Sequence, residues 1–310
     1  MMVRHFLTVS DLTPRELRTC LHLAAAWKRT PRRVKSILAG KTIALIFEKP
    51  SVRTRVSFEV AVRQLGGSTI YLGPEDAQLD RREPVKDVAR TLSRYVDGIV
   101  CRTFSHHHIE ELAQFASVPV INGLSDLHHP CQALADLFTI QEHFGRLKGV
   151  RLAYVGDGNN VLHSLIEGCA MTGVNAVVST PSGYRPDAAI WTAAMRRAKA
   201  RGAVLRWEPN PQRAVQGADV IYTDVWVSMG KEQERRKRLK TFRPYQLNRD
   251  LLRRAKPACR IMHCLPAHRG EEITDDVLES SRSLIVEQAE NRLHVQKALL
   301  LMLLAKRTKR

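Results

Sequence analysis

A short polar segment places two hydroxyl groups and two guanidinium groups where a predicted strand hands over to a predicted helix. An apolar run over 42–47 predicts a buried strand, and apolar residues at helical spacing then predict a helix that ends at Gly66-Gly67. Backbone N–H groups and the helix dipole favour an anion at such a helix start, and arginine matches phosphate oxygens bidentately. The segment predicts a phosphate site, although it lacks the glycines of a P-loop or dinucleotide-binding loop, and a capped helix with solvated arginines is the alternative. The polar residues are Ser51, Arg53, Thr54 and Arg55.

Further polar groups follow other predicted strands. In open parallel sheets, ligands bind beyond the carboxyl ends of the strands. Both halves of the chain contribute such groups, so we expect an active site in a cleft between two domains. The segments are Arg102, His128-His129, Asp157–Asn160, Asp224–Gly230 and His263–Pro266.

Strand-like and helical runs alternate along the whole chain, which is typical of α/β proteins with parallel sheets flanked by helices. A long amphipathic helix over 132–144 ends at Gly145 and Gly149, so we expect a domain junction near 145–150. The first domain would comprise residues 1–147 and the second residues 148–290, with the final helix, about 291–305, returning to the first domain so that residues 291–310 belong to it. The expected strands are 42–47, 69–72, 97–101, 118–121, 151–155, 174–179, 203–206, 219–223, 260–263 and 283–286.

The composition is that of a globular protein with an excess of bases. With 310 residues, 44% of them hydrophobic, the chain can build two domains with cores. The net charge of +18 could indicate a nucleic-acid partner, but the bases are spread along the chain and only 6% of residues are aromatic. The densest basic run, 231–240, is typical of a solvated helix face. We therefore expect no nucleic acid and relate the charge to an anionic small substrate.

The six cysteines are scattered, with no CxxC pair, which favours a reducing compartment over a disulfide framework or a zinc ribbon. The longest strongly apolar stretch, Ala298–Ala305, is far shorter than the roughly 20 residues that span a bilayer. We expect a cytoplasmic protein without a membrane partner.

Histidine pairs and one cysteine raise metal and nucleophile hypotheses. Neither His106–His108 nor His128-His129 has acidic or cysteine partners at a ligand spacing, so we expect no metal. The first group is interpreted as a surface loop, and His129 as a hydrogen-bond donor or proton handler. Cys264 would need an activating base, and its neighbour His263 should point to the opposite face of a strand, so nucleophilic catalysis is the weaker interpretation.

Six motifs in series resemble the ornithine carbamoyltransferases, in the same order and spacing across almost the whole chain. The resemblance implies two α/β domains assembled as a homotrimer or a multiple of trimers. It implies transfer of the carbamoyl group of carbamoyl phosphate to L-ornithine, giving citrulline and phosphate in arginine metabolism, with no metal or organic cofactor. The motifs are S-V-R-T-R, the arginine after D-G-I-V-C, H-P-C-Q, D-G-N-N, D-V-W-V-S-M-G and H-C-L-P.

The resemblance also implies roles for individual residues. The phosphate of carbamoyl phosphate would be bound by Ser51, Val52, Arg53, Thr54 and Arg102. The carbamoyl group would be polarised by His129, Thr54 and Arg292, and its nitrogen held by Gln132 and by backbone carbonyls of Cys264 and Leu265. Ornithine would be bound by Asn160, Asp224, Ser228 and Met229. Gln78 would be lent to a neighbouring subunit, and the catalytic set would comprise Arg102, His129, Cys264 and Arg292.

The sequence leaves several alternatives open. Aspartate carbamoyltransferases share the first-half motifs, and only S-M-G and H-C-L-P favour the ornithine branch. N-acetylornithine or putrescine could replace ornithine as the acceptor. The family commonly has threonine where this chain has Val52, so a catalytically impaired carbamoyl phosphate-binding protein also remains open, although His129, Gln132 and Arg292 are all present.

Overall fold

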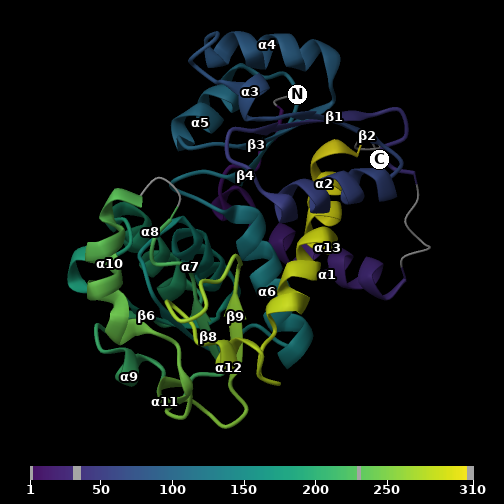
Figure 1. Cartoon of the computed structure of the whole chain (residues 1–310). Helices are drawn as coiled ribbons and strands as arrows, with labels where there is room; N and C mark the ends of the chain where they lie inside the picture. The colour runs from purple at the N-terminus through teal and green to yellow at the C-terminus, as the bar shows by residue number, and fades with distance from the viewer. Residues whose placement is uncertain (1–2, 31–35, 229–231, 306–310) are drawn as a thin grey trace. The chain divides into compact units, whose positions relative to one another are not determined.

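The computed structural model describes residues 3–30, 36–228 and 232–305 (Figure 1). The packing divides the chain into two units, Met1–Phe138 with Asn291–Arg310, and Thr139–Glu290. The divisions fall inside helices α6 (Pro130–Phe144) and α13 (Ile285–Leu304). The sequence places the first junction slightly later, in the turn that follows α6.

The first unit contains a parallel sheet with the strand order β2-β1-β3-β4. The chain leaves β1 for β2 on one side and later returns to β3 on the other, so the strand order reverses between β1 and β3. This is the switch point at which parallel α/β sheets bind ligands. The strands are β1 (Thr42–Phe47), β2 (Ser68–Leu72), β3 (Gly98–Arg102) and β4 (Val120–Leu124).

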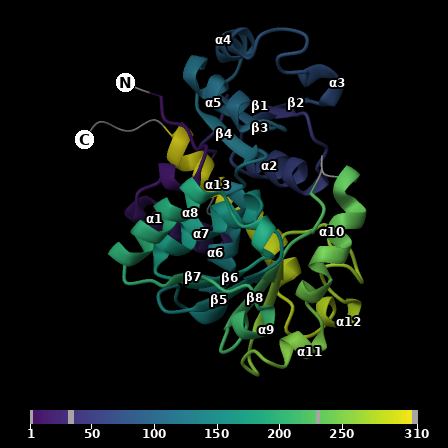
Figure 2. The same cartoon turned by 90° about the vertical axis from the view of Figure 1, so that its left-hand side faces the viewer.

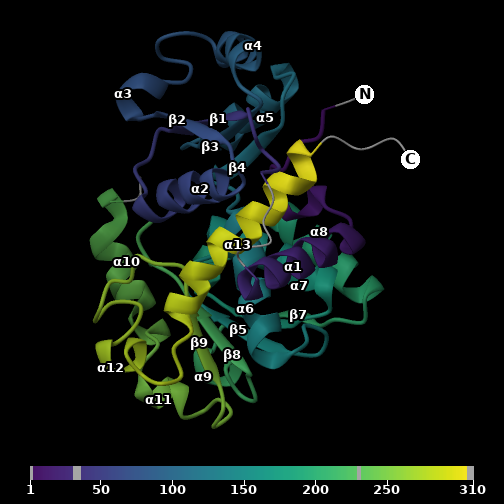
Figure 3. The same ribbon diagram turned by 90° about the vertical axis from the view of Figure 1, so that its right-hand side faces the viewer.

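Helix α13 packs against other helices of the first unit, which confirms the expected return of the final helix (Figure 3). Lys28 Nζ on α1 donates to Asn291 Oδ1 at 2.9 Å, and Lys297 Nζ donates to Gln64 Oε1 on α2 at 2.9 Å. The other helices of this unit are α1 (Pro14–Arg29), α2 (Val52–Gln64), α3 (Pro74–Ala77), α4 (Val85–Tyr95) and α5 (His106–Phe115), with a 3-10 turn η1 (Val9–Asp11).

The second unit contains a parallel sheet with the strand order β7-β6-β5-β8-β9. Its strand order reverses between β5 and β8, which places the switch point beyond the ends of those two strands. The strands are β5 (Arg151–Val155), β6 (Asn175–Ser179), β7 (Leu205–Trp207), β8 (Val220–Thr223) and β9 (Arg260–His263).

In the second unit, α7 and α8 lie side by side (Figure 2). A separate apolar cluster joins Ala153 and Val155 of β5 to Trp226 and Phe242, whose rings stack with centroids 6.0 Å apart. The helices are α7 (Asn160–Thr172), α8 (Ala188–Ala200), α9 (Pro211–Ala214), α10 (Arg235–Phe242), α11 (Arg249–Leu252) and α12 (Asp275–Leu278). The 3-10 turns are η3 (Ser182–Tyr184), η4 (Glu232–Glu234) and η5 (Arg243–Tyr245).

Two predictions about secondary structure are wrong. Residues 283–286 do not form a strand, because only Ser283 bridges to Ile261 before α13 begins at Ile285. His106 is not part of a surface loop: it begins α5, is buried, and its Nδ1 lies 2.9 Å from Ser125 Oγ. In both places the segment is short, and its local pattern alone does not determine its secondary structure. Tertiary packing does.

None of the helices in the described part of the chain combines the length and the apolarity needed to cross a membrane.

Candidate functional site

The predicted phosphate segment forms the N-terminus of α2, directly after β1. Ser51 is the N-cap residue, and its Oγ accepts the backbone N–H of Thr54 at 3.3 Å. Thr54 is fully buried, whereas Val52 is 78% exposed in the first turn. Arg55 does not face the helix start, because it pairs with Glu59 at 2.9 Å and lies over the ring of Tyr71. Of the two guanidiniums that the sequence places in this segment, Arg55 therefore faces other partners, and Arg53 stays the candidate for binding an anion.

Arg292 on α13 joins three segments of the first unit. Its Nη2 donates to Thr54 Oγ1 at 3.0 Å, and its Nη1 donates to Gln132 Oε1 at 3.1 Å. Gln132 Nε2 in turn donates to Asp136 Oδ1 at 2.9 Å, one helical turn along α6. All four side chains are buried. A planar guanidinium with two bonds of this kind is held in one orientation, which suits a donor aimed at developing negative charge.

Asp136 is a member of this site that the motif comparison did not name. It is fully buried, and it holds the amide of Gln132 so that the amide oxygen faces Arg292. The i, i+4 spacing of Gln132 and Asp136 on one helix is the signal that could have identified it.

Arg102 ends β3 beside the phosphate segment, since Phe47 of β1 is its partner in the sheet register. Arg102 and His129 are both buried. Burial, together with the positive charges of Arg292, Arg102 and Arg53, lowers the pKa of His129 well below its ordinary range. His129 is therefore neutral at neutral pH and able to donate one hydrogen bond without adding charge to the anion site.

Because folding lowers the pKa of His129, the free energy of unfolding depends on pH. In the unfolded chain this histidine takes up a proton near its ordinary pKa, about 6.5, while the folded protein does not. The free energy of unfolding should therefore fall as the pH drops below about 6.5, by up to about 1.4 kcal/mol per pH unit from this residue alone. Denaturant titrations of the wild type and His129→Gln at about pH 7 and about pH 5 would measure the difference. The exposed His107 provides the control His107→Gln, and parallel pH profiles for wild type and His129→Gln would contradict the assignment.

Gln78 lies at the end of α3 and is exposed, as a residue offered to another subunit would be. Its Nε2 donates to Glu75 O at 3.1 Å, and the next residue, Leu79, donates its N–H to Glu48 Oε1 at 3.2 Å. Glu48 follows β1 directly, so the Gln78 segment is tied to the same strand end as the phosphate segment.

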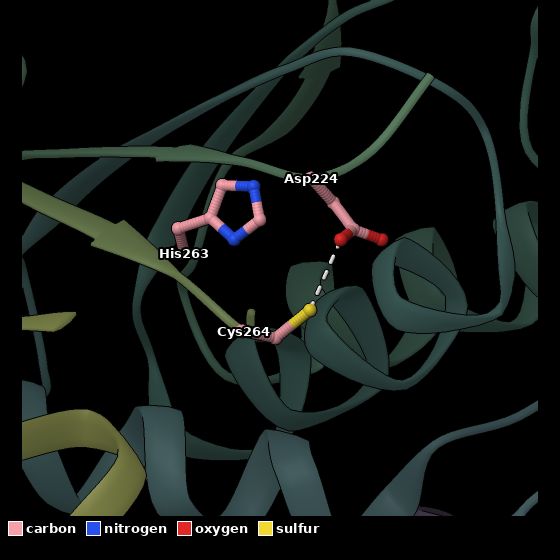
Figure 4. A group of neighbouring side chains, drawn as sticks. All are labelled: Asp224, His263 and Cys264. Atoms are coloured by element: carbon pink, nitrogen blue, oxygen red, sulfur yellow. Dashed lines mark hydrogen bonds between the residues drawn. The ribbon is translucent and has the colours of Figure 1, made fainter. Parts of the chain in front are cut away.

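In the second unit, Asp224 follows β8, and Figure 4 shows it beside His263 and Cys264 at the end of β9. Asp224 is 4% exposed. Its Oδ2 accepts from Asn159 Nδ2 at 2.7 Å, and its Oδ1 accepts from the Cys264 thiol at 3.0 Å. Asn159 also caps α7 through its Oδ1, which accepts from Val161 and Leu162 N–H groups. Asn160, which the motif comparison named for ornithine, is the first residue of α7 and directly follows Asn159.

The strand geometry predicted that His263 and Cys264 point to opposite faces of the strand, and this prediction is wrong. Potential ligand atoms of Asp224, His263 and Cys264 all lie within 4.8 Å of one another, because β9 ends at His263 and Leu265 has a φ of 58°. The imidazole is nevertheless committed elsewhere: Nδ1 accepts the Leu265 N–H at 2.9 Å, and Nε2 lies 3.0 Å from Glu272 Oε1. The Cys264 thiol donates to Asp224, and both ring nitrogens of His263 face other groups, which disfavours nucleophilic catalysis by the thiol.

Arg238 is not part of a solvated helix face, although the basic run suggested one. It is 7% exposed, pairs with Asp157 at 2.8 Å and with Glu234 at 2.8 Å, and donates to Trp226 O at 3.0 Å. The guanidinium thus connects the loop after β5 to the loop after β8, where Ser228 is partly exposed. Met229, the other predicted ornithine contact in that loop, lies outside the described residues.

Both halves of the chain match the domain models of a known enzyme family. Residues 4–142 match the carbamoyl-P binding domain, and residues 148–303 the Asp/Orn binding domain, of the aspartate/ornithine carbamoyltransferases. The chain therefore belongs to the aspartate/ornithine carbamoyltransferase family.

Individual relatives indicate which branch of the family this chain is most similar to among those compared. The chain is 53% identical to the ornithine carbamoyltransferase of Pyrococcus abyssi over 304 residues, which are 97% of this chain and 96% of that protein. It is 53% identical over 299 residues to the anabolic ornithine carbamoyltransferase of Pyrococcus furiosus, covering 96% and 95%. The solved structure of ornithine carbamoyltransferase from Pyrococcus furiosus superimposes with a TM-score of 0.94 at 52% identity, covering 97% of each chain. The resemblance found in the motifs is confirmed.

Proposed function

We propose that this chain is an ornithine carbamoyltransferase of arginine biosynthesis. It transfers the carbamoyl group of carbamoyl phosphate to the side-chain amine of L-ornithine, giving L-citrulline and phosphate. The observation that carries the proposal is the buried Arg292 guanidinium, held between Thr54 and Gln132. The relatives named as ornithine carbamoyltransferases support ornithine as the acceptor, and the relative named anabolic supports the biosynthetic direction.

The first unit would bind carbamoyl phosphate. The phosphate accepts from backbone N–H groups at the start of α2, from the Ser51 and Thr54 hydroxyls, and from Arg53 and Arg102. Attack of an amine on the carbonyl carbon forms a tetrahedral oxyanion, and the carbon–oxygen bond to phosphate then breaks. Donors already in place for the oxyanion are Arg292 and the neutral His129, so charge that develops in the transition state is stabilised without reorganisation.

The second unit would bind ornithine through its α-amino acid group. Asp224 suits the ammonium, Ser228 suits the carboxylate, and Asn160 and Met229 complete the expected set. The attacking side-chain amine must lose a proton, since its ordinary pKa is about 10.4. We propose that Asp224 and the Cys264 segment orient this amine while the departing phosphate accepts the proton. Full activity of a Cys264→Ala variant would remove the thiol from this account and leave Asp224 as the orienting group.

A homotrimer or a multiple of trimers, with Gln78 lent to the neighbouring site, and a cytoplasmic location are parts of the same proposal. A Gln78→Ala protein gives a direct test of the shared site. Mixed with Arg292→Ala protein under conditions of subunit exchange, it should regain activity in hybrid oligomers, because some sites would then contain both wild-type residues. Light scattering after size exclusion gives the oligomeric mass.

A citrulline assay tests the function. Purified protein with carbamoyl phosphate should produce citrulline from ornithine, and N-acetylornithine, putrescine and aspartate should give no comparable turnover. Turnover with another amine would support carbamoyl phosphate as the donor. It would show that the assignment of ornithine to residues 224–230 is wrong. Folded protein without turnover on any of these amines would favour a carbamoyl phosphate-binding protein.

Val52 should weaken carbamoyl phosphate binding relative to threonine. Its side chain is exposed in the first turn of α2, where a hydroxyl would lie beside the anion. Val52→Thr should lower KM for carbamoyl phosphate by the worth of one hydrogen bond, about 0.5–1.5 kcal/mol, with KM for ornithine unchanged. Steady-state kinetics measures both constants, and Val56→Thr, one turn later on the exposed face, is the matched control. An unchanged KM in Val52→Thr would show that this side chain does not contact the substrate.

A further inference from the structure

One fully buried carboxylate holds both ends of the loop that follows β9. Glu272 Oε1 lies 3.0 Å from His263 Nε2, at the start of the loop, and accepts the backbone N–H of His268, at its end, at 2.6 Å. His263 and Glu272 have side-chain exposures of 0%. The loop between these two contacts contains Cys264 and Leu265, the pair expected to act on the carbamoyl group.

The tautomer of His263 follows from its hydrogen bonds. The Leu265 N–H donates to His263 Nδ1 at 2.9 Å, so Nδ1 carries a lone pair. The proton of the neutral imidazole is then on Nε2, which donates to the Glu272 carboxylate. The ring therefore transmits the position of Glu272 to the backbone of Leu265 through two bonds with defined donors and acceptors.

The loop needs such support because its backbone is strained. Leu265 has a φ of 58°, in the left-handed region that residues other than glycine and asparagine rarely adopt. Conformations of this kind persist only where the surroundings determine them. A second contact fixes the strand end: His263 N–H donates to Gln288 Oε1 at 2.9 Å, and Gln288 Nε2 donates to Tyr222 OH at 3.1 Å.

We propose that Glu272 and His263 are positioning residues for carbamoyl transfer: they hold the Cys264–Leu265 backbone in the left-handed conformation that presents its carbonyls to the carbamoyl nitrogen. This inference rests on the proposed function, because it assigns a purpose to the loop of that same site. In this proposal both side chains act through the loop and not by contact with substrate. Their effect is on the geometry of the groups that do, where a displacement of about 1 Å can cost about 100-fold in rate.

A pair of substitutions at Glu272 separates positioning from simple structural support. Glutamine retains Oε1, which can accept both bonds, and its amide faces His268 Nδ1, 3.7 Å from Oε2 in the present structure. Glu272→Gln should therefore keep kcat within about threefold of wild type. Glu272→Leu fills the same space without an acceptor and should lower kcat by about 100-fold. Glu167→Leu, which removes another buried carboxylate of the second unit, is the control and should leave kcat unchanged.

Two further measurements keep the outcomes distinct. Inorganic phosphate binding, followed by calorimetry, should be the same in wild type and both Glu272 variants, because its site lies in the first unit. The rate at which an aromatic disulfide reagent labels Cys264, the one cysteine that is not buried, should rise about tenfold or more in Glu272→Leu and stay unchanged in Glu272→Gln and Glu167→Leu. Cys264→Ala identifies the labelled thiol.

Equal kcat in Glu272→Leu and wild type, or equal labelling rates, would overturn the inference. Equal losses in Glu272→Leu and Glu167→Leu would assign Glu272 to stability alone and overturn it as well. Absence of citrulline synthesis by the wild type would instead defeat the proposed function, while the labelling comparison would still report whether Glu272 holds the loop.

Discussion

Arg292→Lys should lower kcat by about 100- to 1,000-fold. The guanidinium meets the Thr54 hydroxyl at 3.0 Å and the Gln132 amide oxygen at 3.1 Å with two different nitrogens. An ammonium on a flexible stem retains the charge but cannot keep both contacts and still aim a donor at the oxyanion. Removal of one preorganised oxyanion donor typically costs about 100- to 1,000-fold in kcat. Steady-state kinetics with both substrates measures the change.

The control for Arg292→Lys is the same substitution at Arg90 on α4, which pairs with Asp87 on the exposed surface. Arg90→Lys should leave kcat and both KM values unchanged. Thermal unfolding of the two variants would show whether any loss in Arg292→Lys comes from misfolding. A kcat within about threefold of wild type in folded Arg292→Lys would exclude the guanidinium from oxyanion stabilisation.

Asp224→Asn should raise KM for ornithine by about 30-fold or more. In the proposed site the buried carboxylate supplies the negative charge for the ornithine ammonium. Each of its oxygens accepts one hydrogen bond, from Asn159 and from Cys264. An asparagine amide removes that charge and turns a donor toward one of these two partners. Loss of one member of a buried charge pair costs about 2–5 kcal/mol, which is roughly 30-fold or more in affinity. Ornithine titrations at saturating carbamoyl phosphate measure KM.

The strand that carries Asp224 offers its own control. Asp219 precedes β8 as Asp224 follows it, and Asp219 accepts from the Arg151 N–H and pairs with Lys256 at 2.5 Å. Asp219→Asn should lower stability and leave KM for ornithine unchanged. If Asp224→Asn instead changes kcat alone, Asp224 orients the reacting amine but does not bind the α-ammonium group.

Much of the architecture is readable from local patterns. The buried strands are continuous apolar runs, so 42–47, 151–155 and 260–263 match the observed β1, β5 and β9 residue for residue. The start of α2 is readable for the same reason, since Ser51 caps it with a bond to a residue three positions away. Sequence patterns fail to predict secondary structure where a segment could form a strand or a helix at similar local energy, because tertiary packing then decides. The run 283–286 is apolar enough for a strand, but the helix that begins at Ile285 continues through twenty residues and includes it in part.

The sequence alone therefore determines the residue types, the strands and helices, and the order in which motifs follow one another, because these depend on interactions within a few residues. Only the tertiary structure shows that Thr54 and Arg292, 238 positions apart, share a hydrogen bond. It also reveals Asp136 behind Gln132, the bond from Asn159 to Asp224, and Glu272 at both ends of the Cys264 loop. Buried polar groups must find partners wherever the fold brings them, so these pairings follow from the three-dimensional packing of elements that are distant along the chain.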